Sequence, residues 1–162
     1  MSLFAFCQWM EQTSIGTQVR MSLWLFPVIE TIHLFGIVAL VGSTSALDLR
    51  LLGLALQEQS VKNLAWRLLP WAWVGFGVQM MTGILLAASE ATKMYGNIGF
   101  RIKMVLILLA GVNALVFHYT AYRSADQWGE RRMTPMGAKL AGAFSILLWF
   151  GIVAAGRWIA YI

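Results

Sequence analysis

The sequence predicts an all-α fold, an integral membrane four-helix bundle that occupies residues 1–162 as a single domain. Of the 162 residues, 59% are hydrophobic and only 12% are charged, and the mean hydropathy is +0.70. A soluble domain of ordinary composition is about 45–50% apolar and about 25% charged. Four apolar stretches of membrane-spanning length are separated by more polar connections. The composition disfavours disorder, a disulfide scaffold and a nucleic-acid-binding module.

Residues 1–20 precede the first long apolar stretch and mix aromatic with charged side chains. Phe4, Phe6 and Trp9 stand close to Glu11 in the sequence. This mixture favours a helix that lies on the membrane surface. Because the N-terminus lacks a basic region, we expect no cleavable signal, and the first spanning helix then directs insertion.

The four predicted spans are each about 19–25 residues long, which is enough to cross a hydrocarbon core of about 30 Å as a helix. They cover Leu23–Leu47, Leu68–Ser89, Met104–Tyr122 and Gly137–Tyr161. Helices are expected because backbone groups in lipid must pair within their own segment. The aromatic residues near the span ends suit an interfacial belt, and they are Trp24, Trp71, Trp73, Tyr119, Tyr122, Trp158 and Tyr161.

Two of the connections differ in length and composition. Thr92–Phe100 is short and contains two glycines, which predicts a turn. Ser124–Pro135 is longer and charged, which is typical of a solvated loop and also compatible with docking of a partner.

The net charge of +5 comes mainly from Lys and Arg residues at the ends of the apolar runs. This placement indicates contact with lipid headgroups and no nucleic-acid partner. Seven of the twelve Lys and Arg residues lie in the connections after the first and third spans or at the start of the fourth: Arg50, Lys62, Arg67, Arg123, Arg131, Arg132 and Lys139. The positive-inside rule then places these connections in the cytoplasm and both termini outside.

Ionisable side chains within the spans are the first candidates for function, because charges in lipid are costly. They are Glu30 and His33 in the first span, His118 in the third and Arg157 in the fourth. Imidazole binds iron, copper and zinc and is a common axial ligand of haem. Helix bundles build such sites from side chains on facing helices, so the two histidines predict a cofactor or metal site.

Small residues accompany both histidines. Gly36 lies about one turn beyond His33, and Gly111 and Ala114 precede His118 by seven and four residues. Such strips let a flat macrocycle approach a helix, and they equally allow close packing of helices in lipid. The presence of the histidines favours the cofactor interpretation.

The depth of the histidines leaves two ligand sets open. His33 lies nine residues after Trp24, and His118 lies fourteen residues after Met104. At 1.5 Å per residue this offset is about 7 Å, so one haem bridged by both histidines needs helix tilt or shifted boundaries.

The second ligand set pairs His33 with a methionine of the second span. Met80 and Met81 lie at a similar depth, and His–Met ligation raises the potential of a haem. The same methionines are also ordinary core-filling residues.

Two segments carry a family resemblance. The first runs from Ile32-His33-Leu34-Phe35-Gly36 through Val41-Gly42 to Asp48-Leu49-Arg50-Leu51-Leu52-Gly53, and the second joins Lys103 to Ala110–His118. Together they resemble a group of small four-helix membrane proteins of unassigned function from the bacterial inner (cytoplasmic) membrane. More distantly, they are similar to copper-resistance D-type proteins, HemJ-type protoporphyrinogen oxidases and dihaem membrane cytochromes b. The resemblance implies haem b with His33 and His118 as ligands, although two histidines are too few for two bis-histidine haems.

The leading functional hypothesis is a haem b-binding membrane protein that passes electrons between a quinone pool and a partner redox protein. Arg20, Arg101, Lys103 and Arg157 either pair with haem propionates or extend to lipid headgroups. Glu30, one turn from His33, either accepts a proton coupled to electron transfer or is a neutral acid that bonds a neighbouring helix.

Two further functions stay open. A copper- or other metal-handling permease would use Glu30, His33, His118 and Met80 or Met81, and the nine methionines favour copper. A structural subunit without a cofactor would contact only lipid and other protein, including further copies of itself.

Overall fold

The computed structural model of the chain describes residues 2–120, 122–123 and 134–161. Within these ranges it contains seven α-helices and no strand, which confirms the predicted all-α fold. In chain order the helices are α1 (Leu3–Gln12), α2 (Ser14–Met21), α3 (Leu25–Leu52), α4 (Val61–Ser89), α5 (Ala91–Gly96), α6 (Ile98–Tyr119) and α7 (Met136–Trp158).

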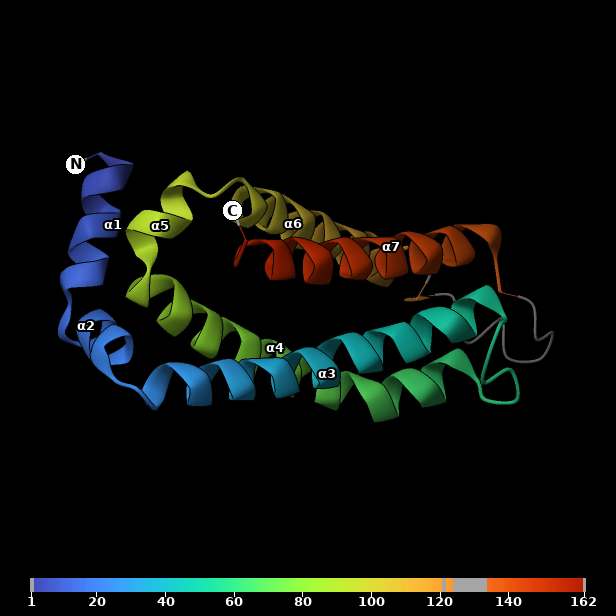
Figure 1. The fold of residues 1–162 in the computed structure, drawn as a ribbon. Helices are drawn as coiled ribbons and strands as arrows, with labels where there is room; N and C mark the ends of the chain where they lie inside the picture. The colour runs from blue at the N-terminus through green and yellow to red at the C-terminus, as the bar shows by residue number, and fades with distance from the viewer. Residues whose placement is uncertain (1, 121, 124–133, 162) are drawn as a thin grey trace.

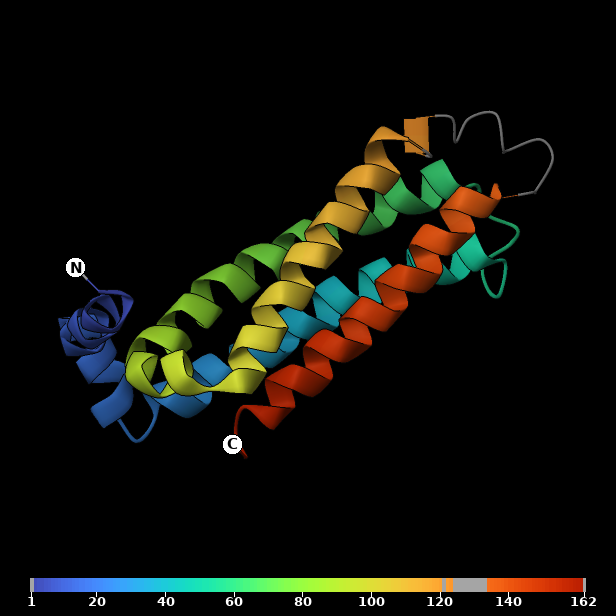
Figure 2. The same cartoon turned by 90° about the horizontal axis from the view of Figure 1, so that it is seen from above.

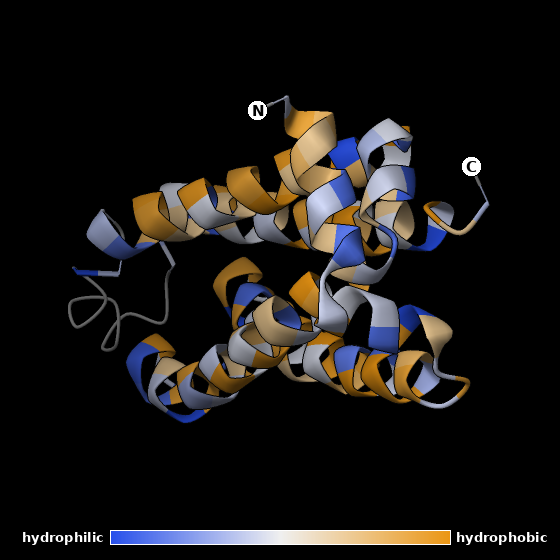
Figure 3. Ribbon diagram, turned by 90° about the vertical axis from the view of Figure 1, so that its left-hand side faces the viewer, coloured by the Kyte–Doolittle hydropathy of each residue, from blue (hydrophilic) through white to orange (hydrophobic). Residues whose placement is uncertain are grey.

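Four of these helices, α3, α4, α6 and α7, are long and apolar enough to cross a membrane. Hydrophobic residues recur along the helices in Figure 3, and Phe35, Leu108 and Phe150 are among the large apolar side chains left exposed. An apolar surface of this extent, on four helices of spanning length, is typical of a protein embedded in lipid. The chain therefore has the features of a multi-pass membrane protein.

The long helices form two pairs, α3 with α4 and α6 with α7 (Figure 1). The pairs meet mainly through α3 and α7. Buried Leu51, Val61 and Ala138 form a core cluster there, with Leu47 and Phe117 packed against it. All five residues belong to the helix ends remote from the termini, so this end of the bundle holds the two pairs together.

Small residues bring α3 and α4 into close contact. A Cβ on Gly75 would lie only 2.5 Å from the Leu40 backbone nitrogen, and one on Gly36 would lie 2.8 Å from Val78 Cγ1. The packing interpretation of Gly36 is therefore confirmed. On α6, by contrast, a Cβ on Gly111 would meet no described atom within 4 Å.

Helix α3 is longer than the predicted span, which stopped at Leu47. It continues through Asp48 and Arg50 to Leu52 and is capped by Gly53, whose φ of 75° is left-handed and suits glycine. The polar residues suggested an earlier end, but both are buried. Arg50 Nε donates to the main-chain oxygen of Gln59 at 2.7 Å, which fixes the connection to α4.

The connections also differ from the predictions. Helix α4 begins at Val61, seven residues before the predicted Leu68, and its N-terminus is capped by the Ser60 hydroxyl. The predicted turn at Thr92–Phe100 is wrong, because this segment contains most of α5 and the start of α6. Most of the Ser124–Pro135 connection, residues 124–133, lies outside the described residues.

Helices α1 and α2 lie across the end of the bundle where both termini are found (Figures 1 and 2). Glu11 joins them to α5: it accepts hydrogen bonds from the Thr92 amide at 3.2 Å and the Thr92 hydroxyl at 2.5 Å, and it pairs with Arg20 at 2.5 Å. The bond from the Thr92 hydroxyl is the main cause that lowers the pKa of Glu11. Both termini lie at the same end of the bundle, as expected for a chain that runs its length four times.

Candidate functional site

His33 is held on α3 by a hydroxyl of α4. Its Nδ1 lies 2.8 Å from Thr82 Oγ1, and Thr82 donates its hydroxyl hydrogen to the Val78 carbonyl at 2.5 Å. A hydroxyl has a single hydrogen to donate, so Oγ1 must accept from Nδ1–H. This bond selects the tautomer of the ring and leaves a lone pair on Nε2.

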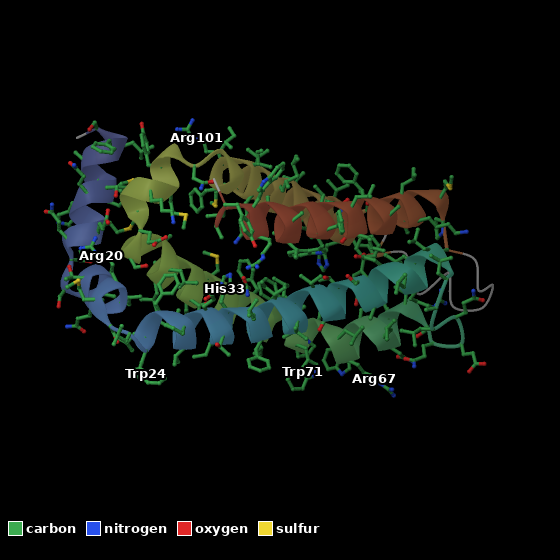
Figure 4. All side chains as sticks on the ribbon, viewed as in Figure 1. Arg20, Trp24, His33, Arg67, Trp71 and Arg101 are labelled. Carbon is green, nitrogen blue, oxygen red and sulfur yellow. The ribbon has the colours of Figure 1, made fainter. Side chains whose placement is uncertain are left out.

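One further hydrogen bond from α4 fixes the main chain at His33, and Gly83 of α4 lies near its ring. Gln79 Nε2 donates to the His33 main-chain oxygen at 2.5 Å, and a Cβ on Gly83 would lie 3.5 Å from the ring carbon Cε1. The ring is half-buried and lies on the side of α3 that faces the α6 and α7 pair in Figure 4. Within the described part of the chain, Nε2 has no hydrogen-bond partner, so it is the nitrogen available to a ligand.

Lys103 brings a positive charge from α6 toward this site. Its charge acts on His33, and its Nζ lies 3.4 Å from the position a Cβ on Gly156 of α7 would take. The ammonium group therefore lies close to Gly156 on α7. Arg157 turns elsewhere, because its guanidinium donates to the Tyr161 hydroxyl at 3.1 Å and lies 5.4 Å from the centre of that ring.

Glu30 lies one turn before His33 on the same side of α3, as the spacing predicted. Its side chain is exposed and, among the described residues, makes no hydrogen bond or ion pair. The structure therefore leaves the Glu30 carboxyl group without a partner among the described residues, on the side of α3 that carries His33.

The structure does not bring His118 to His33. His118 is exposed near the far end of α6, where its ring stacks on Tyr122 at 5.5 Å and meets Tyr119 edge-on. It lies twenty residues after Ile98, the start of α6, whereas His33 lies eight residues after the start of α3. The difference corresponds to about 18 Å along the bundle. This chain does not assemble the bridged arrangement of one haem between both histidines.

The methionines of α4 do not approach His33 either. Thr82 faces α3, and successive residues on a helix differ by about 100°, so Met81 and Met80 are turned about 100° and 200° away. Their side chains are 72% and 48% exposed. Across the described ranges, no three His, Cys, Asp or Glu side chains gather as a metal site. His33 is therefore the only predicted ligand that the fold holds in place.

Several residues that shape the site were missed from the sequence. Thr82 of α4 bonds the His33 ring and Gly83 lies beside it, and a threonine-glycine pair within an apolar stretch was the available signal. Asp48 is also buried, at 6% exposure, and lies beside Ser145 of α7 where the helix pairs meet. Its second oxygen has no partner among the described residues.

A family model described as a family of unknown function, DUF6644, matches residues 6–162. The match includes every residue of the His33 site. No curated protein and no solved structure matches the chain.

Proposed function

Because the chain belongs to the family of unknown function DUF6644, its function is inferred from the site, and we propose that it binds haem b through His33 and passes electrons within the membrane. The observation that carries this proposal is the hydrogen bond from His33 Nδ1–H to Thr82, which leaves Nε2 free. A membrane quinone and a partner redox protein are the proposed electron donor and acceptor.

The donor set fits a haem. Imidazole nitrogen is a common axial ligand of haem iron. A ligating histidine usually donates its other N–H to a neighbouring acceptor, which orients the ring and makes the ligand nitrogen more basic. The Thr82 hydroxyl performs this role for His33. When bound, the haem would supply one-electron redox chemistry.

The chain's own residues supply position and proton exchange. Gln79 and Thr82 hold the His33 backbone and ring against α4, and the helices around the site are apolar enough to span a membrane. Glu30, exposed one turn from His33, is the carboxylate we assign to take up a proton when an electron arrives. Replacement of Glu30 by Gln should then remove pH dependence from the midpoint potential.

With His33 as the single ligand from the described chain, the proposal implies a five-coordinate haem unless another molecule supplies a sixth ligand. The visible spectrum of protein purified from membranes tests this directly. We expect a Soret band that is lost or shifted in His33→Ala and unchanged in His118→Ala, which is the matched control because His118 is exposed and remote.

Other results would replace the proposal. Bound copper without a Soret band would support the metal-handling permease. Purified protein with neither copper nor a Soret band would support a structural subunit. A Soret band that survives His33→Ala would remove His33 as the ligand.

A further inference from the structure

Five cationic side chains belong to the half of the fold that carries the termini, and four of them are engaged by neighbouring groups. The engaged cations pair as Arg20 with Glu11, Lys93 with Glu90, Arg101 with the carbonyl and ring of Tyr95, and Arg157 with the hydroxyl and ring of Tyr161. The fifth cation is Lys103. Among the described residues, it makes no ion pair and no hydrogen bond.

Lys103 also differs from the other four in its location. It lies five residues after Ile98, within the part of α6 that is apolar enough to span a membrane, and it is partly buried. An ammonium group in such surroundings is costly unless an anion accompanies it. We therefore expect the anion that accompanies the Lys103 ammonium to belong to a bound molecule.

The surroundings of Lys103 point toward the His33 site. Its ammonium lies near Gly156 of α7, 3.4 Å from where a Cβ on that glycine would be, and Lys103 is close enough to His33 to act on it electrostatically. A lysine that only extends to the lipid surface has no reason to place its charge near a histidine of another helix. Lys103 is thus the cation of α6 that lies within electrostatic reach of His33.

We propose that Lys103 is the anion-binding residue of the His33 site and binds a carboxylate of the haem. This inference rests on the proposed function and deepens it, because it assigns the second anchoring point of the same ligand. A lipid phosphate offers similar anionic chemistry, so the experiment has to separate the two sources.

The experiment compares haem b with its dimethyl ester, in which both carboxylates are esterified and uncharged. Each is titrated into the haem-free full-length protein in detergent, and binding is followed by the Soret band. A hydrogen bond to a charged group corresponds to about a tenfold or greater difference in affinity, here in favour of haem b (the diacid) over its ester. We expect wild type to show this preference and Lys103→Met to bind both compounds equally.

Two variants make the comparison specific. Lys103→Arg keeps the charge and should retain the preference, which guards against a general folding defect in Lys103→Met. Arg101→Met is the matched control. It also removes one positive charge, two residues before Lys103, but Arg101 already bonds the Tyr95 carbonyl. Its preference for the diacid should equal that of wild type.

A Lys103→Met variant that keeps the wild-type preference for the diacid would overturn the inference. If this variant instead loses bound anionic phospholipid, measured by native mass spectrometry, the ammonium holds a lipid phosphate and the inference is equally wrong. Failure of the proposed function looks different: His33→Ala would then bind haem b with unchanged affinity and spectrum. The His33 and Lys103 variants therefore test the two claims separately.

Discussion

Replacement of Gly75 by Ala should separate α3 from α4 and weaken the site at the same time. The new Cβ would lie 2.5 Å from the Leu40 nitrogen and 2.9 Å from the Gly36 oxygen, both of which are backbone atoms that cannot rotate away. Ordinary contact begins at 3.4 Å, so the helices must move apart locally by about 0.9 Å. Overpacking of this kind costs about 1–3 kcal/mol.

The same displacement reaches His33, because Thr82 is two turns from Gly75 on α4. If α4 moves as a rigid unit, the 2.8 Å distance between His33 Nδ1 and Thr82 Oγ1 grows to about 3.7 Å, which is too long for a hydrogen bond. Loss of this bond would release the ring from its fixed tautomer. Haem affinity should therefore fall together with stability.

Gly77 provides a matched control two residues away, since a Cβ there meets no described atom within 4 Å. Unfolding of both alanine variants in mixed micelles, followed by circular dichroism, gives the difference in free energy of unfolding. Gly77→Ala should equal wild type or exceed it by up to about 1 kcal/mol, because alanine favours helix. Equal stability of the two variants would refute the close packing of α3 on α4.

Three further outcomes are expected. Because hydrogen bonding lowers the pKa of Glu11 below its ordinary 4.5, its stabilisation of the docked α1 and α2 is complete above about pH 4.5 and lost as pH falls through the lower folded value. Hydrogen exchange of residues 3–21, corrected for intrinsic rates, should show this loss in wild type and not in Glu11→Gln. A membrane-impermeant thiol reagent should label Cys7 in intact cells, whereas labelling only after lysis would reverse the orientation. Met80→Leu and Met81→Leu should leave the haem spectrum unchanged, and a shifted spectrum would restore His–Met ligation.

The fold could be predicted from the sequence because hydropathy acts over whole segments. Four runs long enough to cross lipid admit only helices, and the structure has a helix at each. The ends were harder, because Asp48 and Arg50 look like surface residues in sequence although tertiary contacts bury both. The predicted turn before α6 failed for a similar reason: its glycines did not prevent a short helix, α5, from forming and packing against α1.

The sequence predicted some residues of the site and missed others. His33 and Glu30 were identified because ionisable groups within spans are rare, and their shared face follows from helix geometry. Whether His118 would face the same space depended on where α6 begins and how it is rotated, and local sequence does not determine either. Thr82 was missed because the role of a hydroxyl on an apolar helix depends on its hydrogen-bond partner, and that partner lies on another helix.

The measurement that most directly tests the account is the protonation of the His33 ring in the haem-free protein. The chain has two histidines, so 15N NMR of ring-labelled protein, with His118→Gln for assignment, isolates the His33 signals. At about pH 8, where an ordinary histidine is neutral, the proton should reside on Nδ1 with Nε2 bare, and Thr82→Val should remove this preference. A proton found on Nε2 in the wild-type protein would contradict the claim that the fold presents this nitrogen as a ligand.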